Sequence, residues 1–97
     1  MDQSNEALLS GRLRIPDHVL FQEVAGEAAL LNINSELYFG LDEVGTRMWK
    51  ALRDAATIGR ALDALTEIYD AAPDEIRRDL IELVHELKHH GLVDVDL

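Results

Sequence analysis

Residues 85–89 read HELKH, the spacing of a helical zinc site in which two histidines bind the metal and the glutamate acts as a general base. Such a site needs a third protein ligand, and only two aspartates follow the motif as candidates. On a helical wheel, His85, Glu86 and His89 lie on the polar face, opposite the apolar residues. The pattern therefore favours a solvated helix face, and a zinc enzyme is the less favoured alternative.

The other chemistry-bearing residues form no catalytic pattern. The chain has no cysteine, which excludes disulfides, thiolate metal sites and cysteine nucleophiles. Ser10 and Ser35 fall in a predicted tail and a predicted turn without triad partners, and there is no glycine-rich phosphate loop. The many acids of the last predicted helix are typical of a solvated face. We therefore expect no catalytic residue, no metal site and no cofactor.

The charge balance disfavours several partners. The 97 residues include 9 Lys+Arg and 19 Asp+Glu, so the net charge of −10 repels nucleic acids and anionic lipid. A winged-helix DNA binder is a less favoured alternative, because the last predicted helix carries more acids than bases. No apolar run approaches a membrane-spanning length, and residues 1–10 lack the features of a signal peptide. We expect a cytoplasmic protein that binds neither nucleic acid nor membrane.

Alternating apolar residues and turn signals predict three short strands. Residues 1–14 are expected to form a flexible tail, and residues 15–97 a single domain. The predicted strands are Val19–Ala25, Ala28–Ile33 and Glu36–Leu41. Because the connections between them are short, we expect an antiparallel meander in which the third strand lies at an edge.

After residue 41, apolar residues no longer recur at every second position but with a period of about 3.6 residues, which is typical of helices. Three such stretches predict three helices. They are expected over residues 42–53, 57–69 and 73–90. Asp42 and Thr57 are good N-caps for the first two helices, Pro73 suits the first turn of the third, and Gly91 marks its end. Strands followed by helices indicate an α+β domain, in which a three-stranded antiparallel meander precedes three helices in a winged-helix-like order.

The third predicted strand is a candidate binding edge. Its residues are short, flat and apolar: Leu37, Tyr38, Phe39, Gly40 and Leu41. Such an edge binds an extended peptide by strand addition, or it is closed by a second copy of the chain. A narrow arc of the last helix offers a neighbouring wall, formed by Arg77, Ile81, Val84 and Lys88. Ile81 lies off the core stripe of that helix, as a groove floor would need. Peptide binding and homodimer formation both remain open here.

The segment YFGLDEVGTRMW, over residues 38–49, resembles the PqqD family. The resemblance extends upstream to residues 19–33 and downstream to Thr57-Ile58, Tyr69-Asp70 and residues 78–93, in consistent order over about residues 15–95. It implies a small, winged-helix-like, non-catalytic recognition element for ribosomally synthesised and post-translationally modified peptides (RiPPs). Such an element binds the leader region of a precursor peptide and presents it to a modifying enzyme or a leader peptidase.

The resemblance also implies a place for the leader. In the family, the leader adds to the third strand and lies in the groove against the third helix. Carried onto this chain, the strand is Glu36–Leu41 and the helix wall comprises Arg77, Ile81, Val84, His85 and Lys88. Asn34-Ser35-Glu36 stands where members of the quinone pathway usually hold Pro-Glu-Gly. The chain is therefore more similar to stand-alone members from lasso-peptide and other RiPP clusters.

Overall fold

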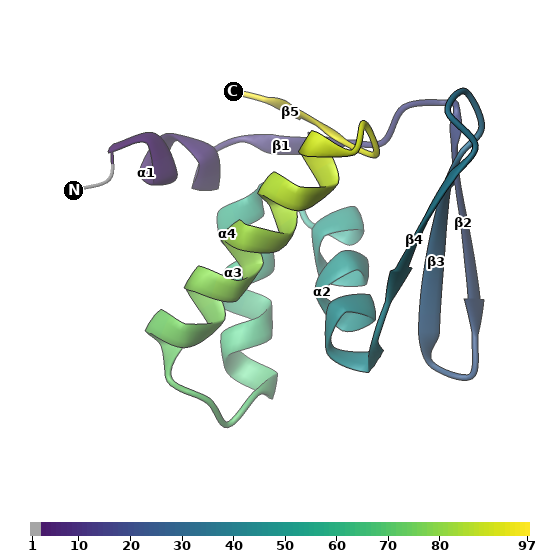
Figure 1. Cartoon of the computed structure of the whole chain (residues 1–97). Coiled ribbons are helices and arrows are strands. Elements are labelled where there is room, and N and C mark those ends of the chain that lie inside the picture. The colour runs from purple at the N-terminus through teal and green to yellow at the C-terminus, as the bar shows by residue number, and fades with distance from the viewer. Residues whose placement is uncertain (1–2) are drawn as a thin grey trace.

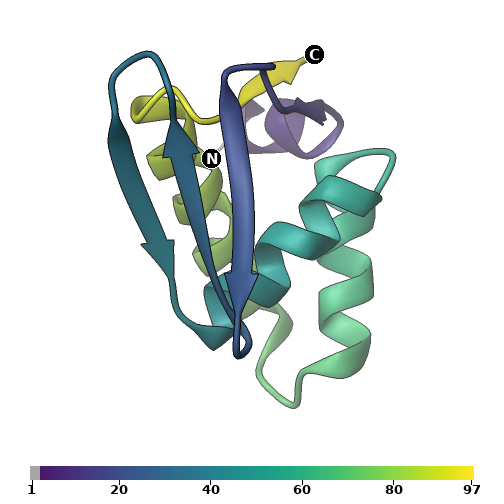
Figure 2. The ribbon, with the colours of Figure 1, turned by 90° about the vertical axis from the view of Figure 1, so that its right-hand side faces the viewer.

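The computed structural model describes residues 3–97, which form a three-stranded sheet, a two-stranded sheet and four helices (Figure 1). The elements are α1 (Gln3–Leu9), β1 (Arg12–Arg14), β2 (Val19–Val24), β3 (Glu27–Asn32), β4 (Leu37–Leu41), α2 (Glu43–Asp54), α3 (Ile58–Ile68), α4 (Pro73–His89) and β5 (Asp94–Asp96). Strands β2, β3 and β4 form an antiparallel meander, and helices lie behind one of its faces (Figure 2). The predicted α+β class is confirmed, while its winged-helix-like detail stays a prediction.

Side chains of the meander alternate between its two faces. Leu30, in the central strand, is fully buried and pairs with Phe21 of β2 and Phe39 of β4. Leu20 and Tyr38 belong to the opposite face and are exposed. That face is turned toward the viewer in Figure 2, and no helix within residues 3–97 covers it. The helices therefore bury one face of the sheet and leave the other open.

The predicted helix starts and stops are confirmed by their capping contacts. Asp42 Oδ1 accepts a hydrogen bond from the Gly45 N–H at 2.8 Å, and Thr57 Oγ1 accepts one from the Arg60 N–H at 3.1 Å. Both bonds satisfy amide groups that have no partner inside the helix. A proline begins α4, and Gly91 follows it with a φ of 71°, a left-handed conformation that favours glycine.

Two buried clusters form the core. The first contains Trp49 of α2, Leu30 of β3 and Leu87 of α4, all fully buried between the sheet and the helices. The second joins α2, α3 and α4 and includes Leu65 and Leu80. Because α2 and α4 each contribute to both clusters, these two helices join the sheet to the helical part of the core. Over residues 3–97, no helix is both long and apolar enough to cross a membrane.

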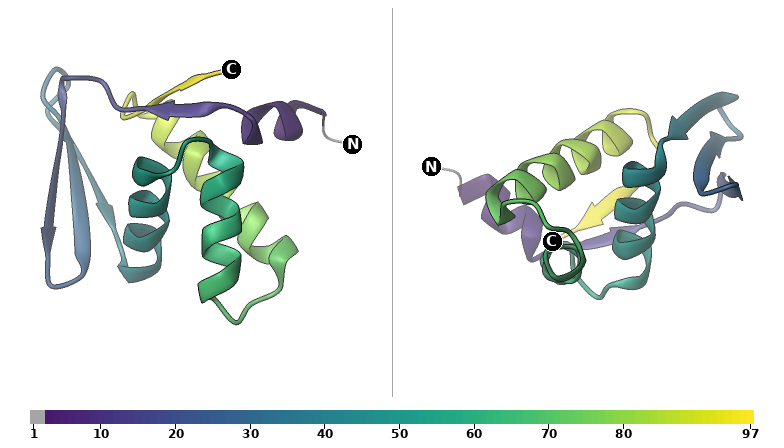
Figure 3. Two further views of the ribbon diagram at one scale, coloured as in Figure 1. Left: turned by 180° about the vertical axis from the view of Figure 1, so that it is seen from behind. Right: turned by 90° about the horizontal axis from the view of Figure 1, so that it is seen from below.

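The N-terminal segment differs from the flexible tail expected over residues 1–14. Residues 1–2 lie outside the described part, but α1 and β1 pack onto the rest of the fold (Figure 3). Leu8 is buried in the helical cluster, and the Ile58 N–H donates a hydrogen bond to the Gly11 carbonyl oxygen at 2.9 Å. Strand β1 pairs antiparallel with β5. Local sequence did not reveal this strand, because its partner lies at the other end of the chain.

One buried hydroxyl group connects α2 to the sheet. Thr46, near the start of α2, is only 2% exposed. Its Oγ1 accepts a hydrogen bond from the Ala28 N–H at 2.8 Å and donates one to the Leu41 carbonyl oxygen at 3.4 Å. Ala28 and Leu41 are paired residues of β3 and β4. The hydroxyl therefore fixes the end of β4, where the chain turns into α2.

Replacing Thr46 with valine should destabilise the protein, because the substitution keeps the shape of the side chain but leaves the buried Ala28 N–H without its partner. We expect the free energy of unfolding to fall by about 1–3 kcal/mol in urea denaturation. Thr46→Ser is the control, since it keeps the hydroxyl and removes one methyl group, and it should cost about 1 kcal/mol or less. A larger loss for serine than for valine would contradict the bridging role of the hydroxyl.

Candidate functional site

Strand β4 has an open edge. It pairs with β3 on one side, and no strand within residues 3–97 pairs with its other side (Figure 2). Leu37 and Tyr38 are 54% and 71% exposed, while Leu41 at the other end is buried. An apolar strand edge with free backbone groups is a template for a further strand. The edge predicted from sequence is therefore present in the fold.

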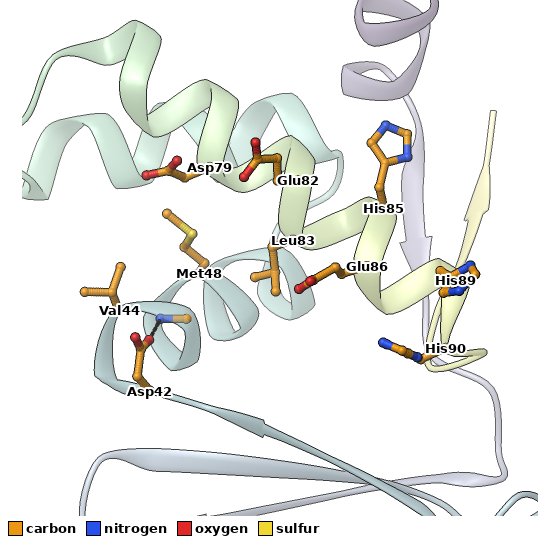
Figure 4. A pocket seen from close by; sticks show the side chains of 11 residues that line it. Asp42, Val44, Met48, Asp79, Glu82, Leu83, His85, Glu86, His89 and His90 are labelled. Carbon is orange, nitrogen blue, oxygen red and sulfur yellow. Dashed lines mark hydrogen bonds between the residues drawn. The ribbon is translucent and has the colours of Figure 1, made fainter.

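A groove begins where β4 ends. It has a volume of about 620 Å³ and runs between the start of α2 and one flank of α4. Val44 and Met48 of α2 and Leu83 of α4 form its apolar part (Figure 4). Val44 is about half exposed, whereas Met48 is almost completely buried. Val44 is therefore available to contact a side chain that enters from solvent.

The strand edge lies next to the groove. The Phe39 ring of β4 packs against the His90 ring at the end of α4, with 5.2 Å between the ring centroids. His90 also lines the groove, as does Asp42, which directly follows β4. A peptide that pairs with β4 would therefore have the groove beside it and would direct every second side chain toward the helices.

The groove is acidic. Its carboxylates belong to Asp42, Asp79, Glu82 and Glu86, and its other ionisable side chains are those of His85, His89 and His90. Within residues 3–97, none of these four carboxylates forms an ion pair. The ion pairs of this part of the chain join other carboxylates to Lys and Arg side chains. The groove contains no Lys or Arg. It therefore combines an apolar floor with a negative rim.

The helix wall predicted from sequence lies mainly elsewhere. Ile81 and Val84 belong to the helical core cluster and are 7% and 0% exposed. Arg77, Ile81 and His85 line a second hollow of about 340 Å³ along α4, which, unlike the groove, contains neither Asp42 nor any residue of α2. His85 borders both hollows, and the exposed Lys88 borders neither. Of the five predicted helix residues, the structure brings only His85 to the groove beside β4; their role in binding stays a prediction.

The comparisons with known proteins agree with this geometry. The family described as coenzyme PQQ synthesis protein D (PqqD) matches residues 27–93, which hold β3, β4 and all of α2, α3 and α4. The chain belongs to the PqqD family. A comparison with curated proteins found no match.

Two solved structures resemble this PqqD-family chain. One is described as TbiB1 in complex with the TbiA(beta) leader peptide; it is 30% identical, with a TM-score of 0.78, over 84% of this chain and 94% of the other. The second is described as a lasso peptide synthetase B1 complexed with the leader peptide. It is 22% identical, with a TM-score of 0.77, over 86% of this chain and 98% of the other, and it shows the fold.

Sequence reasoning missed most of the groove in this PqqD-family protein. It did not assign Val44, Leu83, Glu86 or His90 to a peptide-binding site. The sequence placed Leu83 in the apolar core stripe of α4, whereas the structure leaves this residue partly exposed at the groove. Periodicity identifies both flanks of a helix but does not say which of them faces the sheet. Packing of α4 against the meander decided between them.

The HELKH residues lie at the C-terminal end of α4. His85, Glu86 and His89 are exposed, as a solvated helix face requires. Within residues 3–97, no group of three or more His, Cys, Asp or Glu side chains is placed to hold a metal ion. The third ligand that the zinc interpretation needs is not supplied by this part of the chain.

Replacing Ile81 with alanine should test whether this side chain belongs to the core or to a groove. Its burial predicts that the free energy of unfolding falls by about 2–4 kcal/mol, because the substitution leaves a cavity among packed side chains. Arg77→Ala, on the same helix face, should change it by less than about 0.5 kcal/mol. Urea denaturation of both variants measures the difference. If Ile81→Ala lowers the free energy of unfolding as little as Arg77→Ala does, Ile81 does not belong to the core and is again a candidate for peptide contact.

Proposed function

We propose that this protein is a non-catalytic RiPP recognition element, which binds the leader region of a ribosomally made precursor peptide. The observation that carries the proposal is the open edge of β4 with an apolar groove directly beside it. The similarity to TbiB1, whose structure holds a leader peptide, supports the same role. The partners are the precursor peptide and the modifying enzyme or leader peptidase to which the leader is presented.

We propose that the leader adds as a fourth strand to β4. Backbone hydrogen bonds to the free edge would supply affinity that depends little on sequence, and side-chain pockets would set the register. Side chains that alternate toward the helices would reach Val44 and Leu83, while the others would lie beside Tyr38 on the open face. Ordering a disordered peptide costs about 2–5 kcal/mol, so apolar anchors are needed beside the backbone bonds.

A lasso-peptide type of cluster fits this chain better than the quinone pathway. The similar structures are TbiB1 and a lasso peptide synthetase B1, each with a leader peptide. The turn before β4 also differs from the Pro-Glu-Gly that is usual in quinone-pathway members. Here Asn32 Oδ1 accepts hydrogen bonds from the N–H groups of Asn34 and Ser35, and Glu36 has a φ of 60°. Because a ribosomal precursor is made in the cytoplasm, we propose that leader binding takes place there.

The first experiment is a titration of ¹⁵N-labelled protein with synthetic leader peptides from precursor genes that neighbour this one, followed by ¹H–¹⁵N correlation spectra. We expect shifts concentrated in β4 and at the groove residues Val44, Leu83, Glu86 and His90. Shifts centred on Arg77, Ile81 and Lys88 instead would support the helix wall predicted from sequence. Unchanged spectra with every peptide, together with a dimer in sedimentation, would favour self-association through the same edge.

A substitution at the groove floor should weaken binding without unfolding the protein. Val44→Asn places an amide where a leader side chain would otherwise find an apolar surface, so part of the amide would lose its water without gaining a partner. We expect the dissociation constant to rise about fivefold or more in calorimetric titration. Ile68→Asn is the matched control, because Ile68 is an exposed aliphatic residue of α3 outside the groove. Equal affinity of both variants for the leader would exclude the groove as the binding site.

A further inference from the structure

The arginines of α4 lie on one side of the helix, whereas its carboxylates lie on both, since Asp74 and Glu82 line the second hollow together with the arginines. Asp79 and Glu86 line the groove beside β4 and not the second hollow. Arg77 and Arg78 line the second hollow and not the groove. The helix therefore keeps its arginines away from the surface on which the proposed leader strand would lie.

The carboxylates of the groove are not neutralised by other parts of the described chain. The ion pairs within residues 3–97 use Arg14, Arg47, Lys50 and Arg53, none of which lines the groove. Asp42 is engaged as a helix cap, but Asp79 and Glu86 make no hydrogen bond or ion pair with another described side chain.

From this division we infer that the groove selects a leader whose bound strand carries a Lys or Arg close to an apolar anchor. The inference rests on the proposed function and adds the charge of the ligand to it. The apolar anchor lies on the Val44 and Leu83 side chains, and the cation lies against Glu86, which lines the groove at the same end as His90 (Figure 4). Charge complementarity of this kind fixes the register of a peptide and disfavours acidic competitors.

Strand geometry brings the two features within reach of one peptide. Residues two apart on a strand point to the same side and lie about 6–7 Å apart. In Figure 4, Leu83 and Met48 lie between α4 and α2, and the carboxylate of Glu86 extends into the same space, one turn further along α4. An apolar residue and a Lys or Arg two positions away in the leader therefore face the floor and the rim together.

The test uses the full chain and the synthetic leader peptides of the titration. The variants are Glu86→Lys in the groove and Glu67→Lys on the exposed surface of α3, which change the net charge equally. At about 0.05 M salt, we expect Glu86→Lys to weaken leader binding about five- to tenfold and Glu67→Lys to weaken it less than about twofold. The difference should shrink at about 0.5 M salt.

A peptide with its Lys or Arg changed to Glu completes the test. This peptide should bind the original protein more weakly and recover affinity with Glu86→Lys. Equal affinity of Glu86→Lys and Glu67→Lys for the leader, or a bound segment without Lys or Arg, would overturn the inference and leave the proposed function standing. No binding of any leader to the original protein would overturn both.

Discussion

The hydrogen bonds of the Thr46 hydroxyl hold the sheet and the helices in one arrangement. They join the first turns of α2 to the paired residues Ala28 and Leu41, at the point where β4 ends. This contact fixes the first turns of α2 against the end of β4, and therefore where Val44 lies relative to the strand edge. Trp49, further along α2, then buries its ring against the inner face of the meander. The groove beside β4 exists because these two residues fix α2 against the sheet.

An open apolar strand edge exposes a protein to aggregation, and this chain carries two features that oppose it. The net charge of −10 makes copies of the chain repel one another. The edge strand is also only five residues long. Both features leave the edge accessible to an extended peptide. A ligand that carries positive charge gains from the same negative field that keeps the protein copies apart.

Several parts of the fold followed from local sequence, because their causes are local. Asp42 and Thr57 cap their helices through hydrogen bonds to amides three residues away, so residue type and position were enough to place both helix starts. The meander followed from the alternation of apolar residues and from short turns. The N-terminal segment did not follow, because Leu8 and β1 are held by contacts with α2–α4 and β5, which no local pattern records.

The sequence by itself indicated a candidate binding strand, because residues 37–41 are apolar and end a meander whose last strand lies at an edge. It also determined the acidic character of the chain and the residues that each helix offers on its flanks. Only the tertiary structure decided which flank of α4 faces that edge. With Leu87 packed beneath the sheet, Leu83 and Glu86 line the groove between α4 and the start of α2, while Ile81 and Val84 lie in the helical core. The periodicity of a helix shows which residues share a side, but packing against neighbouring elements decides which side each neighbour contacts.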